Sequence, residues 1–329
     1  MAKTVNSAFT EFNKDYVNLD KAKTTTARSS RDWLYGQLNN FPVNDDTFPL
    51  SYEERHIKFG SFARNTKIRE LDDIDLIYCL HANNAYYSKS SLYTNRYYLH
   101  TENAGKRLKD LSTDNYLNSI KVVNKFVSSL SNISQYKSAA IHRRQEAATL
   151  NLTSYDWTFD IVPAFYTTSG FYLIPDGNGY WKATNPELDQ QYTASMNSKH
   201  DFSVHQLIRT LKYWNRRAQM PTISSFLFEN FVLNFAESKS ELSTHIDINI
   251  INFWYYLKSA IYNNVADPKG IDTNLNQLTY DEMNKISSKA NDAYTKGYEA
   301  YRLETEDSNQ SSAISKWREI FGNDFPQYT

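Results

Sequence analysis

The chain has 329 residues, a hydrophobic fraction of 40% and a formal net charge of −1 at pH 7. This length allows one large bilobal fold or two domains with a sizeable core, and the near-neutral charge argues against a dominant nucleic-acid footprint. The single cysteine, Cys79, excludes a disulfide framework and a structural zinc site and suits a reducing cytoplasm. We expect it to be a buried, inert thiol. We see neither a signal peptide nor a bilayer-spanning apolar stretch, so we expect a cytoplasmic protein with no membrane partner.

Hydrophobic periodicity predicts helices at the N-terminus and strands after them. Val5, Phe9 and Phe12 belong to a helical stripe, and a polar break at 23–30 precedes a second helix containing Trp33. Residues 86–109 are polar and Tyr-rich without a clear period, which predicts a long mobile insertion. Further along the chain we expect a helix at 114–130 and strands near 139–152 and 157–165.

The pattern becomes mainly helical from about residue 199. Helices are expected at 201–217, 225–237, 247–262, 280–303 and 309–320. His200 and His205 are expected as surface residues on a helix. The element order predicts an α+β fold with two domains. The first, at 1–198, includes the N-terminal helices, and the second is a helical C-terminal lobe at 199–329.

Gly60 and Ser61 stand near the start of the stretch with the most specific signal, FGSFARNTKIRELDDIDLI at 59–77. Glycine lets a phosphate approach the backbone closely. Ser61 offers a hydroxyl and a backbone N–H at the start of a short helix predicted at 62–67, and a helix N-terminus favours anions. On its own, the pair is also typical of an ordinary turn.

Eleven residues separate Ser61 from Asp73, which with Asp75 opens an apolar run that predicts a buried strand. Residues two apart on a strand share a face, so both carboxylates point to one side and Ile74 and Leu76 to the other. Paired carboxylates repel each other, and hard cations that bind carboxylate and phosphate oxygens relieve that repulsion. An Asp-x-Asp pair can also be a solvated strand end. After Gly-Ser, it indicates nucleotidyl transfer with Mg²⁺ or Mn²⁺, as a pair of ions.

A third carboxylate is expected on a separate strand, and Asp160 in WTFDIVPAF at 157–165 is the candidate. A lone Asp can cap or bend a strand, but its charge is costly in a buried run unless it is paired or binds metal. Asp160 is expected to help hold the catalytic metal and to act as base toward a ribose hydroxyl. Asp156 is the weaker candidate because it lies at the polar edge of the segment.

The order of these motifs resembles the DNA polymerase β nucleotidyltransferase superfamily. Within it, the chain resembles the bacterial cGAS/DncV-like nucleotidyltransferases (CD-NTases), relatives of the oligoadenylate synthases, from about residue 5 to residue 326. The segments that carry this resemblance are YLIPDGNGYWKATNP at 172–186, LIRTLKYWNRR at 207–217, ISSFLFE at 223–229, DPKGIDTNL at 267–275 and WREIFGNDFP at 317–326. The resemblance implies a polymerase β-like core with a mixed sheet, a helical C-terminal lobe, and nucleotide binding in the cleft between them.

The resemblance also implies a role for each matching residue. The catalytic and metal-binding positions are Asp73, Asp75 and Asp160, and the nucleotide-binding positions are Gly60, Ser61, Arg209, Lys212, Ser225 and Phe226. Lys212 and Ser225 match phosphate contacts, and Phe226 matches an aromatic residue that stacks on the donor base.

Ordinary structural roles are open for the same positions. Lys212 and Arg209, one turn apart on a helix, can be solvated surface residues. Ser224 or Ser225 can be the N-cap of the next helix, and Phe226 can belong to the core.

The function that the resemblance implies is synthesis of a cyclic di- or trinucleotide second messenger from NTPs, with release of pyrophosphate, in bacterial anti-phage (CBASS) defence. The expected partners are ATP, GTP, UTP or CTP as substrates, an effector protein that senses the product, and a phage RNA or protein as activator. Three alternatives stay open: a template-independent enzyme with a linear product, a nucleotidyl-transferring toxin, and a non-catalytic nucleotide or RNA sensor.

Overall fold

The computed structural model describes residues 2–329, and the chain forms two compact units. The first, called the sheet unit below, consists of Lys21–Arg64 and Leu71–Gln190. The second, called the helical unit, consists of Met1–Asp20, Asn65–Glu70 and Gln191–Thr329. In these units the first helix groups with the C-terminal helices, whereas the predicted first domain includes it. The domain boundary at 198/199 stays a prediction.

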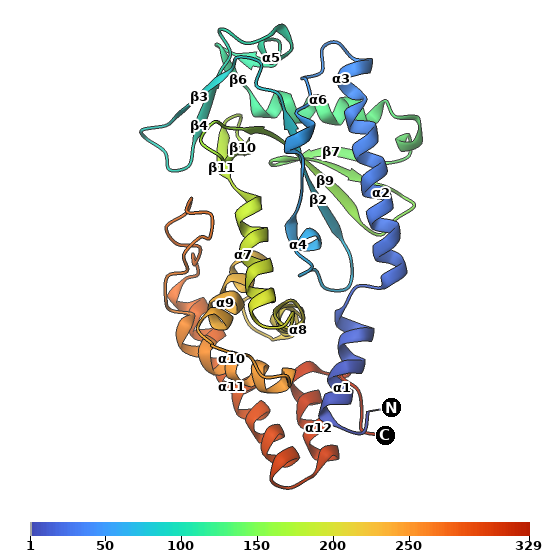
Figure 1. The fold of residues 1–329 in the computed structure, drawn as a ribbon, viewed down its shortest axis with the longest axis vertical. Coiled ribbons are helices and arrows are strands. Elements are labelled where there is room, and N and C mark those ends of the chain that lie inside the picture. Colours follow the sequence, from blue (N-terminus) through green and yellow to red (C-terminus); the bar gives the residue numbers. More distant parts are fainter. Residues whose placement is uncertain (1) are drawn as a thin grey trace. The chain divides into compact units, whose positions relative to one another are not determined.

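A mixed sheet of eleven strands forms the sheet unit within the described residues (Figure 1). Its order is β1-β2-β9-β10-β11-β4-β6-β5, and β3 pairs with β4, β7 with β8, and β8 with β9. The strands are β1 (Ile57–Phe59), β2 (Asp73–Leu80), β3 (Tyr86–Lys89), β4 (Tyr97–His100), β5 (Ser112–Thr113), β6 (Tyr116–Leu117), β7 (Ala140–Arg144), β8 (Ala147–Asn151), β9 (Thr158–Tyr166), β10 (Tyr172–Pro175) and β11 (Trp181–Thr184). The expected strands near 139–152 and 157–165 are confirmed.

Short and long helices flank this sheet. They are α2 (Lys21–Asn39), α3 (Phe41–Asn44), α4 (Gly60–Ala63), α5 (Lys106–Lys109) and α6 (Ser119–Ser131), with 3-10 turns at Glu53–Arg55 and Ser134–Tyr136. The predicted break at 23–30 is wrong, because those residues lie within α2. The helix expected at 114–130 begins only at Ser119, after Asn118 accepts hydrogen bonds from the N–H groups of Ile120 and Lys121 as its N-cap.

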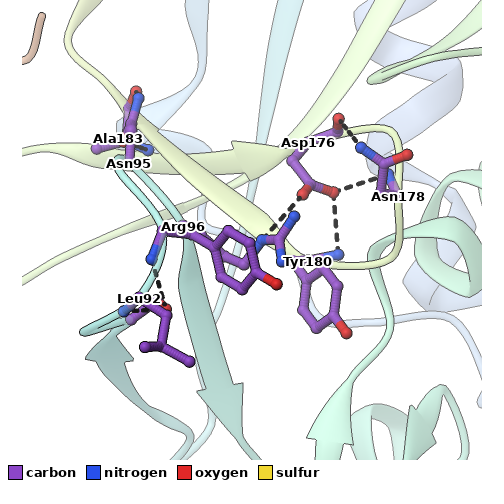
Figure 2. Close-up of polar contacts among 9 residues, drawn as sticks. Leu92, Asn95, Arg96, Asp176, Asn178, Tyr180 and Ala183 are labelled. Atoms are coloured by element: carbon purple, nitrogen blue, oxygen red, sulfur yellow. Dashed lines mark hydrogen bonds and ion pairs between the residues drawn. The ribbon is translucent and has the colours of Figure 1, made fainter.

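The prediction of a mobile insertion at 86–109 is also wrong, because β3 and β4 form an antiparallel hairpin that joins the sheet. The Ala183 N–H donates to Asn95 Oδ1 at 2.8 Å. Arg96 stacks on the Tyr93 and Tyr180 rings, 3.9 and 4.5 Å from their centroids. Figure 2 shows the Arg96 guanidinium beside Asp176, with Nε 3.9 Å from Oδ2. Aromatic and cation–π contacts therefore order a segment that has no hydrophobic period.

The helical unit contains the first helix and the C-terminal helices. Its elements are α1 (Val5–Phe12) with a π-helical continuation at Asn13–Val17, α8 (Val204–Arg217), α9 (Ser225–Glu237), α10 (Ile246–Ala260), α11 (Tyr280–Thr305) and α12 (Gln310–Phe321), and α7 (Pro186–Lys199) leads into it from the sheet unit. The C-terminal helices agree with the predicted ranges, whereas α7 was not predicted. The predicted α+β class with a helical C-terminal lobe is confirmed. No helix in residues 2–329 is long and apolar enough to cross a membrane.

Aromatic side chains join the two ends of the chain in the core of the helical unit. Thr4 caps α1, and Phe9, which is 1% exposed, contacts Trp317 and Phe325 edge-on at centroid distances of 4.9 Å each. Ala2 forms a β-bridge with Tyr328, so both termini lie together (Figure 1). These contacts explain why residues 2–20 belong to this unit.

Two predictions about single residues have opposite outcomes. Cys79 of β2 is a buried free thiol, as expected, and burial raises its pKa to about 12. His200 was expected on a surface helix, but it lies between α7 and α8, is 4% exposed, and places Nε2 2.9 Å from the carbonyl oxygen of Ala236.

We expect Phe9→Ala to lower the free energy of unfolding by about 3–5 kcal/mol, because truncation leaves a cavity among aromatic rings. Phe202→Ala is the matched control, since Phe202 is 73% exposed in the same unit and its loss should change stability by no more than about 0.5 kcal/mol. Urea unfolding followed by circular dichroism measures both. Equal effects of the two substitutions would contradict the role of Phe9 in the core.

Candidate functional site

Strands β2 and β9 bring the expected carboxylates to one face of the sheet. The two strands are parallel neighbours, with Asp75 in register with Asp160 and Asp73 in register with Thr158. Exposure alternates at the start of both strands: Ile74 and Leu76 are 1% and 0% exposed, whereas the three acids are partly exposed. Because side chains two apart, and side chains in register on neighbouring strands, share a face, Asp73, Asp75 and Asp160 point to the same side.

Gly60 lies against one of these acids. In β1, Phe59 pairs with Asp75, and Gly60 follows with φ +77°. A Cβ at Gly60 would lie 1.8 Å from Asp75 Oδ2, which is far inside van der Waals contact. Residue 60 must therefore be glycine for two reasons, the backbone conformation and the space that the carboxylate fills.

Asp160 has a fixed orientation. The Thr149 hydroxyl, from the neighbouring strand β8, donates to Asp160 Oδ1 at 2.6 Å. Three carboxylates on one face suit a hard divalent cation by donor type. Among residues 2–329, however, no three His, Cys, Asp or Glu side chains are grouped closely enough to hold a metal ion. The three carboxylates therefore fit a divalent cation by donor type and strand register alone.

Ser61 lies within α4, in the turn that begins at Gly60. The predicted helix at 62–67 is wrong in its bounds, because α4 covers Gly60–Ala63. From Asn65 to Glu70 the chain belongs to the helical unit, and it returns to the sheet unit at Leu71, just before β2. The Gly-Ser pair and the acidic pair are thus joined by a segment that packs elsewhere.

Lys212 of α8 is buried, so the alternative of a solvated surface lysine is wrong. Its Nζ lies 2.9 Å from Glu229 Oε1, and the two side chains are 6% and 2% exposed. The same ammonium donates to the Thr66 carbonyl at 3.1 Å. A buried ammonium is stable only with such partners.

Arg209, one turn earlier on α8, is also held within the helical unit. It donates to Asn18 Oδ1 at 2.7 Å, to the Asn65 carbonyl at 2.5 Å and to Gln206 Oε1 at 3.0 Å. Burial lowers its pKa to about 10. Arg209 therefore remains a cation at neutral pH and is not an ordinary solvated residue.

Ser225 and Phe226 begin α9. The N-cap position is Ser224, whose side chain makes no capping hydrogen bond. The ammonium of Lys269 lies 4.0 Å from the centroid of the Phe226 ring and 2.8 Å from Asp267 Oδ1. The half-buried Phe226 ring thus faces a cation in the helical unit.

Two residues that support the candidate site were missed in the sequence. Thr149 orients Asp160, and Glu229 pairs with Lys212. Both depend on tertiary neighbours, although the strand alternation of AATLN at 147–151 could have indicated which face Thr149 shares.

Comparison with known proteins identifies a relative that matches the whole chain. The chain is 44% identical to a probable cyclic nucleotide synthase of Bacillus cereus (strain VD146), over 100% of this chain and 99% of that protein. No protein-family model matches the chain.

Solved structures share the fold at low identity. CdnC of E. coli MS115-1, in complex with HORMA-deltaN, has a TM-score of 0.72 and 18% identity, covering 98% of each chain. The apo form of Vibrio cholerae DncV has a TM-score of 0.70 and 14% identity, covering 99% of this chain and 97% of that one. CdnC has also been solved with ATP, at a TM-score of 0.70 and 19% identity over 98% of each chain.

We expect Gly60→Ala to destabilise the protein by about 2 kcal/mol or more, because it combines a strained φ with a clash against Asp75. Gly36→Ala is the control: Gly36 lies inside α2 with no atom within 4 Å of an added Cβ. That change should stabilise the protein by up to about 1 kcal/mol. Urea unfolding compares the two, and a Gly60→Ala protein as stable as wild type would contradict the close contact.

Proposed function

Because this chain belongs to the bacterial cGAS/DncV-like nucleotidyltransferases (CD-NTases), we propose that it makes a cyclic di- or trinucleotide second messenger from NTPs and releases pyrophosphate. It is a nucleotidyltransferase, and the observation that carries the proposal is the close approach of Gly60 to Asp75, beside Asp160. This arrangement supports the proposal, because nucleotidyl transfer requires a phosphate-binding turn close to carboxylates, and the Gly60 turn lies beside Asp75 at one strand end. A reaction of this type needs both a place for the triphosphate and a source of compensating positive charge.

The acidic residues would hold the cations. Asp73, Asp75 and Asp160 are proposed to bind two divalent ions, Mg²⁺ or Mn²⁺, which would neutralise charge on the phosphates. Asp160 is also proposed to accept the proton of the attacking ribose hydroxyl. The hydrogen bond from Thr149 supports this role, because it leaves the carboxylate in one fixed orientation.

The remaining positions would bind the donor nucleotide. Gly60 and Ser61 would receive the triphosphate through backbone N–H groups and the serine hydroxyl. Arg209, Lys212 and Ser225 are proposed to contact phosphates. Phe226 is proposed to stack on the donor base, as an aromatic ring can with any of the four bases.

The reaction follows from these roles. A ribose hydroxyl of the acceptor nucleotide attacks the donor α-phosphorus, a phosphodiester bond forms, and pyrophosphate leaves. In a cyclic dinucleotide, a second transfer between the two ends of the linear intermediate expels another pyrophosphate and closes the ring; a cyclic trinucleotide needs one transfer more. The substrates must therefore reorient between successive transfers.

The biological role proposed is anti-phage (CBASS) signalling in the cytoplasm. The product would activate a separate effector protein, and a phage RNA or protein would act as activator. The CdnC structure with HORMA-deltaN supports a protein partner for this chain. The CdnC structure with ATP supports an NTP substrate.

We expect purified protein, incubated with radiolabelled ATP, GTP, UTP and CTP and with Mg²⁺ or Mn²⁺, to form a product that resists phosphatase. Asp73→Asn/Asp75→Asn should abolish it, because the amides cannot supply the anionic oxygens that hard cations prefer. Asp156→Asn is the matched control, since Asp156 is exposed and pairs with Lys23 at 2.8 Å. Chromatography and mass spectrometry identify the product.

Other outcomes separate the alternatives. A phosphatase-sensitive oligonucleotide would indicate a linear-product synthase. Label attached to a protein or tRNA would indicate a toxin-type transferase. Nucleotide binding without any product, also in the presence of RNA from phage-infected cells, would indicate a sensor and contradict the proposal.

A further inference from the structure

The segment Asn65–Glu70 is tied to the helical unit by a row of cations on α8. Arg209, Lys212 and Arg216, spaced three and four residues apart, lie on one face of that helix. They donate to the backbone carbonyls of Asn65, Thr66 and Arg69 at 2.5, 3.1 and 3.4 Å, in that order.

The same segment is also fixed from its own side. The Arg69 N–H donates to the Val17 carbonyl at 2.9 Å, and Ile68 is 3% exposed in the hydrophobic core of the helical unit. Asn65 follows Ser61 by four residues and Glu70 precedes Asp73 by three. Only a few residues of chain therefore connect this segment to Ser61 on one side and to Asp73 on the other.

Among these cations, Lys212 depends on a second helix. Its Nζ lies 2.9 Å from Glu229 Oε1 of α9, and Glu229 is 2% exposed. An ammonium has three N–H donors and can turn toward any acceptor within reach. Glu229 takes one donor and the Thr66 carbonyl takes another, which fixes the direction of the Lys212 side chain.

We propose that Glu229 is a positioning residue for nucleotidyl transfer: through Lys212 it holds segment 65–70, and it fixes the ammonium that the proposed function assigns to a donor phosphate. The role of the Lys212 ammonium rests on the proposed function, whereas the hold on segment 65–70 concerns the helical unit alone. The two effects can therefore be tested separately.

The first measurement is amide hydrogen exchange of segment 65–70 in the full-length protein without nucleotide. In Glu229→Gln the amide oxygen keeps a weaker hydrogen bond to Lys212 and loses the charge. We expect exchange at the Arg69 amide to become roughly tenfold faster, the factor that the difference between a charged and a neutral hydrogen bond implies. Unchanged exchange at 65–70 would overturn the proposal, whatever the activity.

Glu319→Gln is the matched control for this measurement. Glu319 lies on α12 of the same unit and pairs with Lys296 and Lys316 at 3.2 Å, with a side chain that is 43% exposed. Its replacement should leave exchange at 65–70 as in wild type. The strand β8 peptide 147–151 serves as an internal reference in every variant.

The double variant Lys212→Met/Glu229→Met covers the case that Glu229→Gln does not fold. It leaves no unpaired buried charge, and replacing a buried ion pair with apolar side chains is often tolerated. Its melting temperature should therefore recover toward wild type, while exchange at 65–70 stays fast because the bond to Thr66 is lost. Wild-type exchange in a stable double variant would also overturn the proposal.

Pyrophosphate release separates positioning from a purely structural role. We expect kcat to fall about a hundredfold in Glu229→Gln, as small misplacements of binding groups produce, and to stay low in the double variant despite its recovered melting temperature. If the Lys212–Glu229 pair were purely structural, the double variant would regain activity together with stability. That result would overturn the role of Glu229 in fixing the Lys212 ammonium. A wild-type protein that releases no pyrophosphate, also in the presence of RNA from phage-infected cells, would instead contradict the proposed function and leave the exchange result valid.

Discussion

The parallel pairing of β2 with β9 is the constraint on which the candidate site depends. It sets Asp75 beside Asp160 on one face of the sheet, an arrangement that like-charge repulsion opposes. Backbone pairing along eight positions maintains this arrangement. A slip of one residue would turn every side chain of β2 to the opposite face and separate the acids. The pairing of β1 with β2 then brings Gly60 to Asp75, so both halves of the motif are placed by strand register.

The parts of the fold with strong apolar periodicity could be predicted from the sequence. The alternation of acids with Ile74 and Leu76 in β2, and the helical spacing after residue 199, reflect burial of one face, which the sequence records directly. The hairpin of β3 and β4 could not be predicted in this way. Its order comes from contacts such as Arg96 with Tyr180, between residues far apart in the chain.

The environment of each predicted site residue was harder to predict than its identity. Lys212 was recognised by its place in a motif, but nothing local indicates that it is buried against Glu229, seventeen residues further on and on another helix. The same holds for Thr149, whose bond to Asp160 exists only because β8 and β9 pair. Such partners are selected by tertiary packing, and a single sequence contains no periodic signal for them.

The union of the two chain ends in the helical unit has a consequence for biosynthesis. Phe9 leaves the ribosome long before its partners Trp317 and Phe325, because the whole sheet unit lies between them in the sequence. At a synthesis rate of about 5–20 residues per second, the apolar face of α1 stays uncovered for tens of seconds. The sheet unit can fold during this interval, whereas the core of the helical unit closes only after Trp317 and Phe325 have been synthesised.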